Sequence, residues 1–284
     1  MIYISSSCVK HSKIKDSVQE LVDNGFRNIE LSGGTEYYEG FEDDLLKLKN
    51  KYNLNYVCHN YFPPPQKHLV LNLASLNEDI YTQTFEQLKR AIKLSKKLGA
   101  TKFGFHAGFF LDIKVSEIGK KLSKNSLFNK KEAISRFCNG FEKLKLLSDS
   151  VELYVENNVY SISNSMTYEN ENIFMLTNYS EFTELSEKIS FKLLVDVAHL
   201  KVSASTLNLD FKQELSNMIE NSNYIHISDN DALHDQNNML LEDSNLVRLL
   251  RQYDLKDKDF TLEIYDNMIN IKKTHEVLKG IIND

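Results

Sequence analysis

The chain has 284 residues, 42% hydrophobic and 26% charged, which is the composition of an ordinary soluble globular protein. The formal net charge of −6 disfavours a protein whose main task is to neutralise phosphate backbones, because such domains are usually basic. We therefore expect a small molecule as the partner and no nucleic acid.

The three cysteines, Cys8, Cys58 and Cys138, are odd in number, widely spaced and without a C-x-x-C pair. This pattern indicates reduced thiols rather than a disulfide framework. The first residues lack the basic and apolar regions of a signal peptide, and no apolar run has the length needed to span a bilayer. We therefore expect a cytoplasmic protein without a membrane partner.

Short β-like runs alternate with longer amphipathic stretches along the chain. Eight of these runs are rich in β-branched and aromatic residues, as strands buried on both faces should be. The predicted strands are 2–5, 27–32, 54–59, 102–106, 152–156, 191–196, 223–227 and 259–264.

The segments between the predicted strands have helical spacing of apolar residues. In the first of them, Ile14, Val18, Leu21 and Val22 recur at i, i+4, i+7 and i+8. Eight strand–helix units predict the α/β class and a (β/α)8 TIM barrel, because a doubly wound sheet usually stops at about five or six strands. No composition shift or linker divides the chain, so we expect one domain over residues 1–284.

Seven of the eight predicted strands finish with an acidic residue or a histidine. These residues are Glu30, His59, His106, Glu156, Asp196, His226 and Glu263. One such residue alone would be explained by a private salt bridge or a loop cap, but seven together indicate a shared site. The strand ends form the buried mouth of a barrel, and no Lys or Arg stands at the equivalent positions. One divalent metal ion is the simplest partner, and these ligand types suit Mn²⁺, Co²⁺, Zn²⁺ or Mg²⁺.

Six motifs occur in order along the chain. They are YVCHNYFPP (56–64), FGFHAGF (103–109), YVENN (154–158), LVDVAHL (194–200), YIHISDND (224–231) and FTLEIYD (260–266). In this order and spacing they resemble the sugar phosphate isomerase/epimerase family, whose xylose isomerase-like TIM-barrel superfamily also contains endonuclease IV. The most specific part is the D-x-x-H of Asp196 and His199 followed by IHISDN.

The resemblance implies a metal-dependent isomerase or epimerase that moves a proton next to a carbonyl of a small sugar or sugar derivative, through an enediolate. The metal ligands would be Glu156, Asp196, His226 and Glu263, and the acid/base pair would be Glu156 and Glu263, on opposite faces of the substrate. The substrate-binding residues would be His59, His106, His199, Asp235 and Glu30.

Other activities remain open at this point. A keto-polyol dehydratase would use the same parts, and a barrel that binds carbohydrate or metal without turnover would use some of them. A third alternative is an endonuclease IV-like zinc phosphodiesterase acting on damaged DNA. That branch has a D-x-H where this chain has Asp235-Gln236-Asn237, so one zinc ligand is lost. Ketose 3-epimerase relatives carry a further Glu where this chain has Ile162, which weakens the transfer of that activity.

Long connections after a barrel strand lie on the catalytic face and often cover the substrate. We expect 60–80 and 157–180 to do so, and we expect substrate specificity to reside in 60–80, 107–130 and 157–180. Related barrels often pair through their helical faces, so the resemblance also allows a homodimer.

Overall fold

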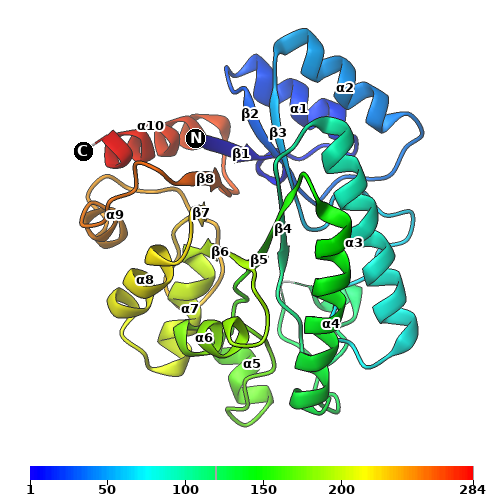
Figure 1. Ribbon diagram of the computed structural model, residues 1–284. Helices are drawn as coiled ribbons and strands as arrows, with labels where there is room; N and C mark the ends of the chain where they lie inside the picture. Colours follow the sequence, from blue (N-terminus) through cyan, green and yellow to red (C-terminus); the bar gives the residue numbers. More distant parts are fainter. Residues whose placement is uncertain (119, 284) are drawn as a thin grey trace.

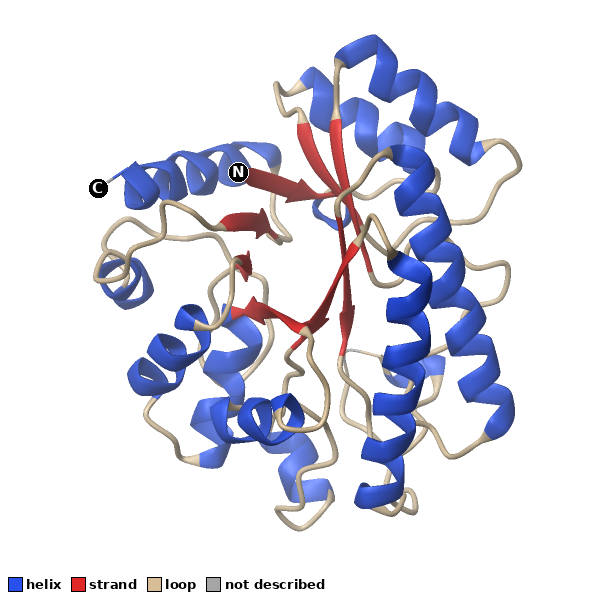
Figure 2. Ribbon diagram, viewed as in Figure 1, coloured by secondary structure: helices blue, strands red, loops and turns tan. Residues whose placement is uncertain are grey.

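The computed structural model describes residues 1–118 and 120–283, so residue 119 of the predicted 107–130 connection and residue 284 lie outside it. Eight parallel strands form one closed barrel in sequence order, which confirms the predicted (β/α)8 TIM barrel (Figures 1 and 2). The strands are β1 Ile2–Ser5, β2 Asn28–Leu31, β3 Asn55–His59, β4 Lys102–His106, β5 Glu152–Glu156, β6 Lys192–Asp196, β7 Tyr224–Ile227 and β8 Asp259–Leu262. Each lies within its predicted run.

Helices surround the barrel, and the C-terminal helix contacts β8, which pairs with β1 (Figure 1). The helices are α1 Ile14–Asp23, α2 Phe41–Tyr52, α3 Glu78–Leu98, α4 Lys130–Ser148, α5 Ile162–Thr167, α6 Tyr179–Ser186, α7 Val197–Leu207, α8 Phe211–Glu220, α9 Asn245–Leu250 and α10 Met268–Asn283, with short 3₁₀ turns η1 Ser6–Cys8 and η2 Val115–Glu117. No helix in the described part of the chain has the length and apolarity to cross a membrane.

The long helices pack their apolar faces on the barrel. The predicted stripe of α1, formed by Ile14, Val18, Leu21 and Val22, is buried in the main hydrophobic core. Alternate strand residues point inward and fill the barrel, as in other barrels of this kind. This interior cluster consists of Tyr3, Val57, Tyr154, Leu194 and Tyr224.

The register of the strands brings the predicted site residues side by side. His106 of β4 pairs with Glu156 of β5, and Asp196 of β6 pairs with His226 of β7. Because all strands are parallel, these residues lie at the same end of the barrel, the carboxyl end, where barrel enzymes place their active sites.

Candidate active site

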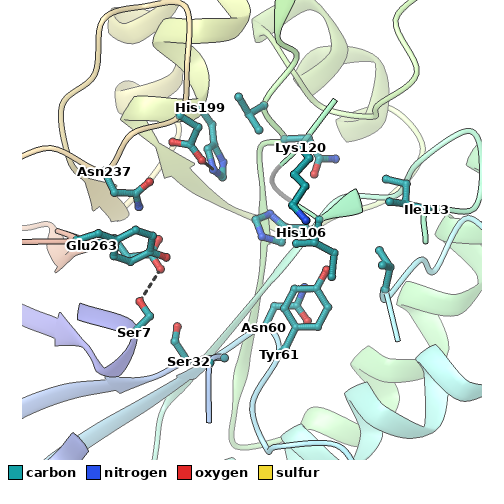
Figure 3. A pocket seen from close by; sticks show the side chains of 18 of the residues that line it. Ser7, Ser32, Asn60, Tyr61, His106, Ile113, Lys120, His199, Asn237 and Glu263 are labelled. Carbon is teal, nitrogen blue, oxygen red and sulfur yellow. Dashed lines mark hydrogen bonds and ion pairs between the residues drawn. The ribbon is translucent and has the colours of Figure 1, made fainter. Parts of the chain in front are cut away.

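A pocket of about 1080 Å³ opens at the carboxyl ends of the strands. Five of the residues proposed from the sequence line it, and Figure 3 shows three of them from close by. The five are His59, His106, His199, Asp235 and Glu263. The remaining predicted residues, Glu30, Glu156, Asp196 and His226, are buried below the pocket surface.

The buried carboxylate of Glu156 lies at the centre of four imidazoles. Its Oε2 is 2.7 Å from Nε2 of His59 and 3.0 Å from Nδ1 of His106. Its Oε1 is 3.4 Å from Nδ1 of His226 and 3.9 Å from Nδ1 of His199. One oxygen of Glu156 therefore faces one pair of histidines, and its other oxygen faces a second pair.

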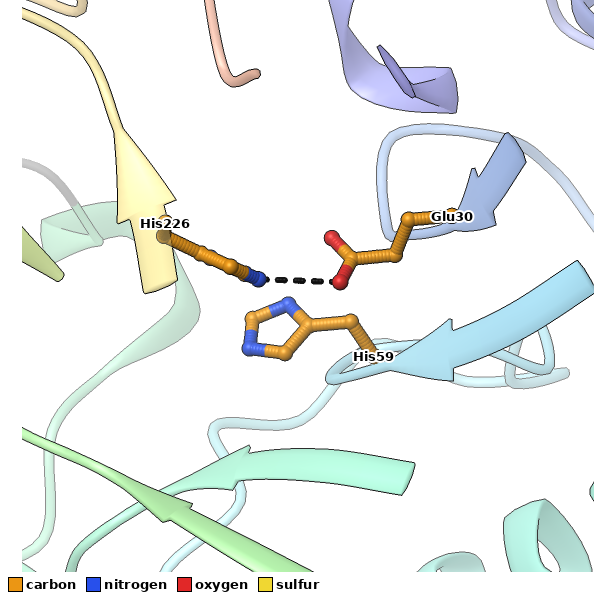
Figure 4. Close-up of side chains that lie close together, drawn as sticks. All are labelled: Glu30, His59 and His226. Atoms are coloured by element: carbon orange, nitrogen blue, oxygen red, sulfur yellow. Dashed lines mark hydrogen bonds and ion pairs between the residues drawn. The ribbon is translucent and has the colours of Figure 1, made fainter. Parts of the chain in front are cut away.

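The orientation of His226 is set by Glu30, which lies beside it (Figure 4) and does not line the pocket. Nε2 of His226 is 2.9 Å from Oε2 of Glu30, and the same oxygen accepts hydrogen bonds from the hydroxyls of Tyr224 and Thr261. A carboxylate that accepts the N–H of one imidazole nitrogen leaves the other nitrogen free to bind a metal. Nδ1 of His226 accordingly faces Glu156 and Glu263.

The D-x-x-H motif is a helix N-cap that fixes both of its functional side chains. Asp196 is the N-cap of α7, and its Oδ1 accepts the N–H of His199 at 2.7 Å. The backbone of Asp196 makes two hydrogen bonds with the side chain of Asn157, and Nδ1 of His199 lies 2.9 Å from the Asn157 carbonyl. Nε2 of His199 therefore remains available and lies 3.3 Å from Oδ2 of Asp235.

Glu263 follows β8 and stands on the pocket wall, held by the first connection of the barrel. The hydroxyl of Ser7 donates to Oε1 of Glu263 at 3.2 Å (Figure 3), and Ser7 in turn contacts Ser5 at 2.8 Å. The thiol of Cys8 donates to the Leu262 carbonyl at 3.4 Å, next to Glu263 in the chain. The other oxygen, Oε2, is 3.6 Å from Nδ1 of His226.

The site has buried polar atoms whose hydrogen-bonding capacity is unused. Oε1 of Glu156 and Nδ1 of His226 have no hydrogen-bond partner, and Nδ1 of His106 faces Oε2 of Glu156 at 3.0 Å without the geometry of a hydrogen bond. Two atoms that each lie about 2.1 Å from one tetrahedral ion are about 3.4 Å apart, and His226 has two carboxylates at 3.4 and 3.6 Å. The distances from His226 to these two carboxylates are therefore those expected of side chains that share one divalent ion.

The donors form overlapping groups whose ligand atoms lie within 4.8 Å of one another. One group is Asp196, His226 and Glu263, three of the four predicted ligands. The fourth predicted ligand, Glu156, groups with Asp196 and His199 and also with His59 and His106. Asp196 is therefore shared between the group of three predicted ligands and the group of Glu156 and His199, and Glu156 is shared between that second group and the one with His59 and His106.

Neighbouring charges govern protonation at this centre. Burial alone would raise the pKa of Glu156, but the imidazoles of His106 and His59 outweigh it and hold the pKa well below its usual value. Burial would lower the pKa of His226, but Glu30 and the other carboxylates raise it well above the usual value. In the absence of a metal, protonated imidazoles therefore balance the carboxylate charge.

The pKa of Asp196 is shifted in the opposite direction to that of Glu156. Burial raises its pKa, His199 opposes this, and the carboxylates of Glu156 and Asp235 raise it further, to about 7. A buried carboxylate that holds a proton near neutral pH has too few cations around it. This is a second indication that the mouth of the barrel is built for an added positive charge.

The family model of the xylose isomerase-like TIM barrel matches residues 18–280 of the chain. The protein belongs to this family. The resemblance inferred from the motifs is confirmed. A probable endonuclease 4 from Sulfurihydrogenibium sp. (strain YO3AOP1) is 24% identical over 199 residues, which cover 67% of this chain and 62% of that protein. The match thus spans less than two thirds of that relative.

Solved structures show the same fold at low sequence identity. A D-tagatose 3-epimerase-like protein has a TM-score of 0.72 and 17% identity, with 99% of this chain and 97% of that chain covered. Endonuclease IV from Thermus thermophilus has a TM-score of 0.64 and 15% identity, with coverage of 99% and 98%. The 3-keto-D-glucoside 4-epimerase of E. coli has a TM-score of 0.66 and 10% identity, with coverage of 100% and 99%.

Proposed function

We propose that this family member is a metal-dependent isomerase or epimerase that moves a proton next to a carbonyl of a sugar or sugar derivative. The observation that carries the proposal is Glu263, a carboxylate on the pocket wall beside buried, unpartnered metal donors. Two structural relatives named above are described as epimerases of sugars or sugar derivatives, which supports this substrate class.

The residues that would hold the ion are Glu156, Asp196, His226 and Glu263. When bound, a divalent ion polarises a carbonyl and stabilises negative charge on the neighbouring oxygens. The side chain of Glu263 is 13% exposed, and Ser7 occupies one of its oxygens, so the other is directed to the site interior. Glu263 is thus the carboxylate best placed to take a proton from a substrate carbon.

Glu156 is the second member of the proposed acid/base pair. Its side chain is only 1% exposed, whereas that of His106, 3.0 Å away, is 21% exposed and lines the pocket. We infer that Glu156 exchanges protons with the pocket through His106. His199, with its Nε2 available beside Asp235, would donate to or accept from substrate hydroxyls.

A zinc-dependent phosphodiesterase is the second candidate, and a specific observation favours it. His59, His106 and Glu156 form a further possible metal group next to the predicted one, and a probable endonuclease 4 is a sequence relative. Asn237 lines the pocket where the nuclease resemblance expects a histidine, and the chain is acidic. These two features favour the sugar enzyme.

Solvent-deuterium uptake by a panel of aldoses, ketoses and keto-sugars tests the proposal, with Mn²⁺, Co²⁺ or Zn²⁺ supplied. We expect deuterium at the carbon next to the carbonyl, lost in Glu263→Gln and retained in Glu184→Gln, an exposed carboxylate of α6. Loss of water from the labelled sugar would instead identify the dehydratase.

Cleavage of DNA with an abasic site, with several zinc ions per chain, would replace the sugar proposal by the nuclease. Bound sugar without any deuterium uptake would reduce the protein to a binding module. Metal content per chain, measured by elemental analysis, accompanies both assays.

A further inference from the structure

The pocket is larger than one sugar needs. Its volume of about 1080 Å³ is at or above the upper end of the roughly 300–1,000 Å³ of clefts that enclose drug-sized ligands. The metal-type donors and Glu263 occupy one side of it. Figure 3 shows Ile113 and Lys120 on the other side, away from Glu263. A substrate confined to the donors would leave this second side unused.

The second side of the pocket carries an apolar wall, although Glu117, Lys120 and Lys121 of the connection after β4 also line the pocket. Its residues come from the connections after β3, β4 and β5, three segments that the sequence predicts to set specificity. The wall residues are Val70, Phe109, Ile113, Ile118, Leu122 and Phe174. Ile118 is 45% exposed, although it is a large apolar side chain inside a concave site. Apolar surface of this kind gains free energy when a ligand removes it from water.

Ring contacts and hydrogen bonds hold Phe109, Leu122 and Phe174 of the wall in place. Phe109 and Phe174 form an isolated antiparallel bridge, and their rings lie 5.5 Å apart in an edge-to-face arrangement. The side-chain amide of Asn72 donates to the carbonyls of Phe109 and Leu111 at 3.1 and 3.0 Å, and the Leu122 N–H donates to Asn164 at 3.1 Å. A pre-organised wall loses little conformational entropy when a ligand binds.

We propose that the substrate is a keto-glycoside, in which an apolar or aromatic group joined at the anomeric carbon packs on this wall and a keto group elsewhere on the sugar supplies the carbonyl. The inference rests on the proposed function for the sugar end of the molecule and adds the chemistry of the other end. The sugar lies against the donors near Glu263, and the aglycone lies against Ile113, Ile118 and Phe174. Lys120, at the same side, already donates to the Ser116 carbonyl at 3.0 Å, so its cation is partly engaged by the protein.

Binding of matched glycosides to the metal-loaded protein tests this inference. Methyl and phenyl glycosides of the same set of keto-sugars are titrated by calorimetry, together with the corresponding 1-phosphates of these keto-sugars. We expect the phenyl glycoside to bind about tenfold more tightly than the methyl glycoside of the same sugar, because a ring is added to the buried apolar area. Ile113→Ala and Ile118→Ala should each reduce that ratio by about threefold.

Leu146→Ala is the matched control, because Leu146 is 84% exposed on α4 and does not line the pocket. It should leave the ratio unchanged. Equal binding of methyl and phenyl glycosides, or an unchanged ratio in both wall variants, overturns the inference. Tighter binding of the 1-phosphate than of the phenyl glycoside also overturns it and assigns the second side to an anion.

The assay requires no turnover, so its failure is distinct from that of the proposed function. If free sugars take up deuterium but phenyl glycosides do not bind preferentially, the inference about the aglycone is wrong and the proposed function stands. If phenyl glycosides bind preferentially but no sugar takes up deuterium, the wall binds an aglycone and the proposed isomerase or epimerase activity is wrong.

Discussion

The carboxylates at the two ends of the barrel have different cationic partners. At the amino end, Nζ of Lys102 lies 3.2 Å from Oδ2 of Asp259 and 2.9 Å from the Tyr154 hydroxyl. The other oxygen of Asp259 is 2.6 Å from the N-terminal amine, and Glu152 pairs with Lys192. Each of these carboxylates therefore has a permanent cation beside it.

At the carboxyl end, the cationic partners of four carboxylates in the described part of the chain are imidazoles. Among the described residues, Glu30, Glu156, Asp196 and Glu263 have no ion pair with Lys or Arg. The carboxylate charge at the amino end is thus neutralised by permanent cations. At the carboxyl end it is neutralised by protons on the imidazoles, which a metal ion would displace. In a barrel, the first arrangement supports stability and the second supports function.

Removal of the central carboxylate should have the largest effect. In Glu156→Gln we expect kcat/KM to fall by about 10²- to 10³-fold and the metal content to fall with it, because a neutral amide neither binds the ion well nor balances four imidazoles. Kinetics and elemental analysis give both values. Glu152→Gln is the control, since Glu152 begins the strand that Glu156 ends, and it should keep metal and activity. Full metal content in Glu156→Gln would contradict the assigned site.

The matching test at the amino end of the barrel removes a cation instead of a carboxylate. In Lys102→Met we expect the free energy of unfolding to fall by about 2 kcal/mol, because Asp259 loses a partner in a largely buried setting. Both side chains retain some exposure, at 11% and 19%, so the loss should be below that of a fully buried pair. Urea denaturation measures it. The folded variant should keep its metal, and a loss of metal would show that the two ends are not independent.

The barrel could be predicted from local sequence patterns, but the apolar wall of the pocket could not. Strand positions follow from short apolar runs, and β1, β4 and β5 match their predicted bounds in full. The apolar wall depends on contacts between connections, such as Phe109 with Phe174, that are far apart in sequence. No periodicity marks such contacts, because each connection is irregular by itself.

The site could be predicted where its residues carry charge. The ligand candidates are marked by an acid or a histidine at a strand end, and the structure brings them together. Glu30 is predicted to bind substrate, and the structure places it buried against His226, where it does not line the pocket. The roles of Ser7 and Asn157 have no distinctive signal in the sequence, because both are neutral side chains that follow a strand. Asn157 is visible there only as part of the VENN motif.

The position of Glu30 leads to a smaller effect than loss of a ligand. In Glu30→Gln we expect metal affinity to weaken by about 10- to 100-fold, because the amide no longer holds His226 in one tautomer and orientation. Competition with a chelator measures the affinity. Tyr224→Phe removes only one hydrogen bond to Glu30 and should weaken affinity less than Glu30→Gln does. An unchanged affinity in Glu30→Gln would assign Glu30 to stability, together with the amino end.

The smallest effect is expected where the carboxyl end contacts a neutral side chain. In Ser7→Ala, Glu263 loses the hydrogen bond that fixes Oε1, and a hydrogen bond to a charged group contributes about 1.5 kcal/mol or more. We therefore expect kcat to fall about tenfold with metal affinity nearly unchanged. Ser163→Ala, which changes a pocket hydroxyl that contacts Ser161 rather than Glu263, is the matched control. A fall in metal affinity without a fall in kcat would show that Ser7 holds Glu263 for binding the ion and not for moving the proton.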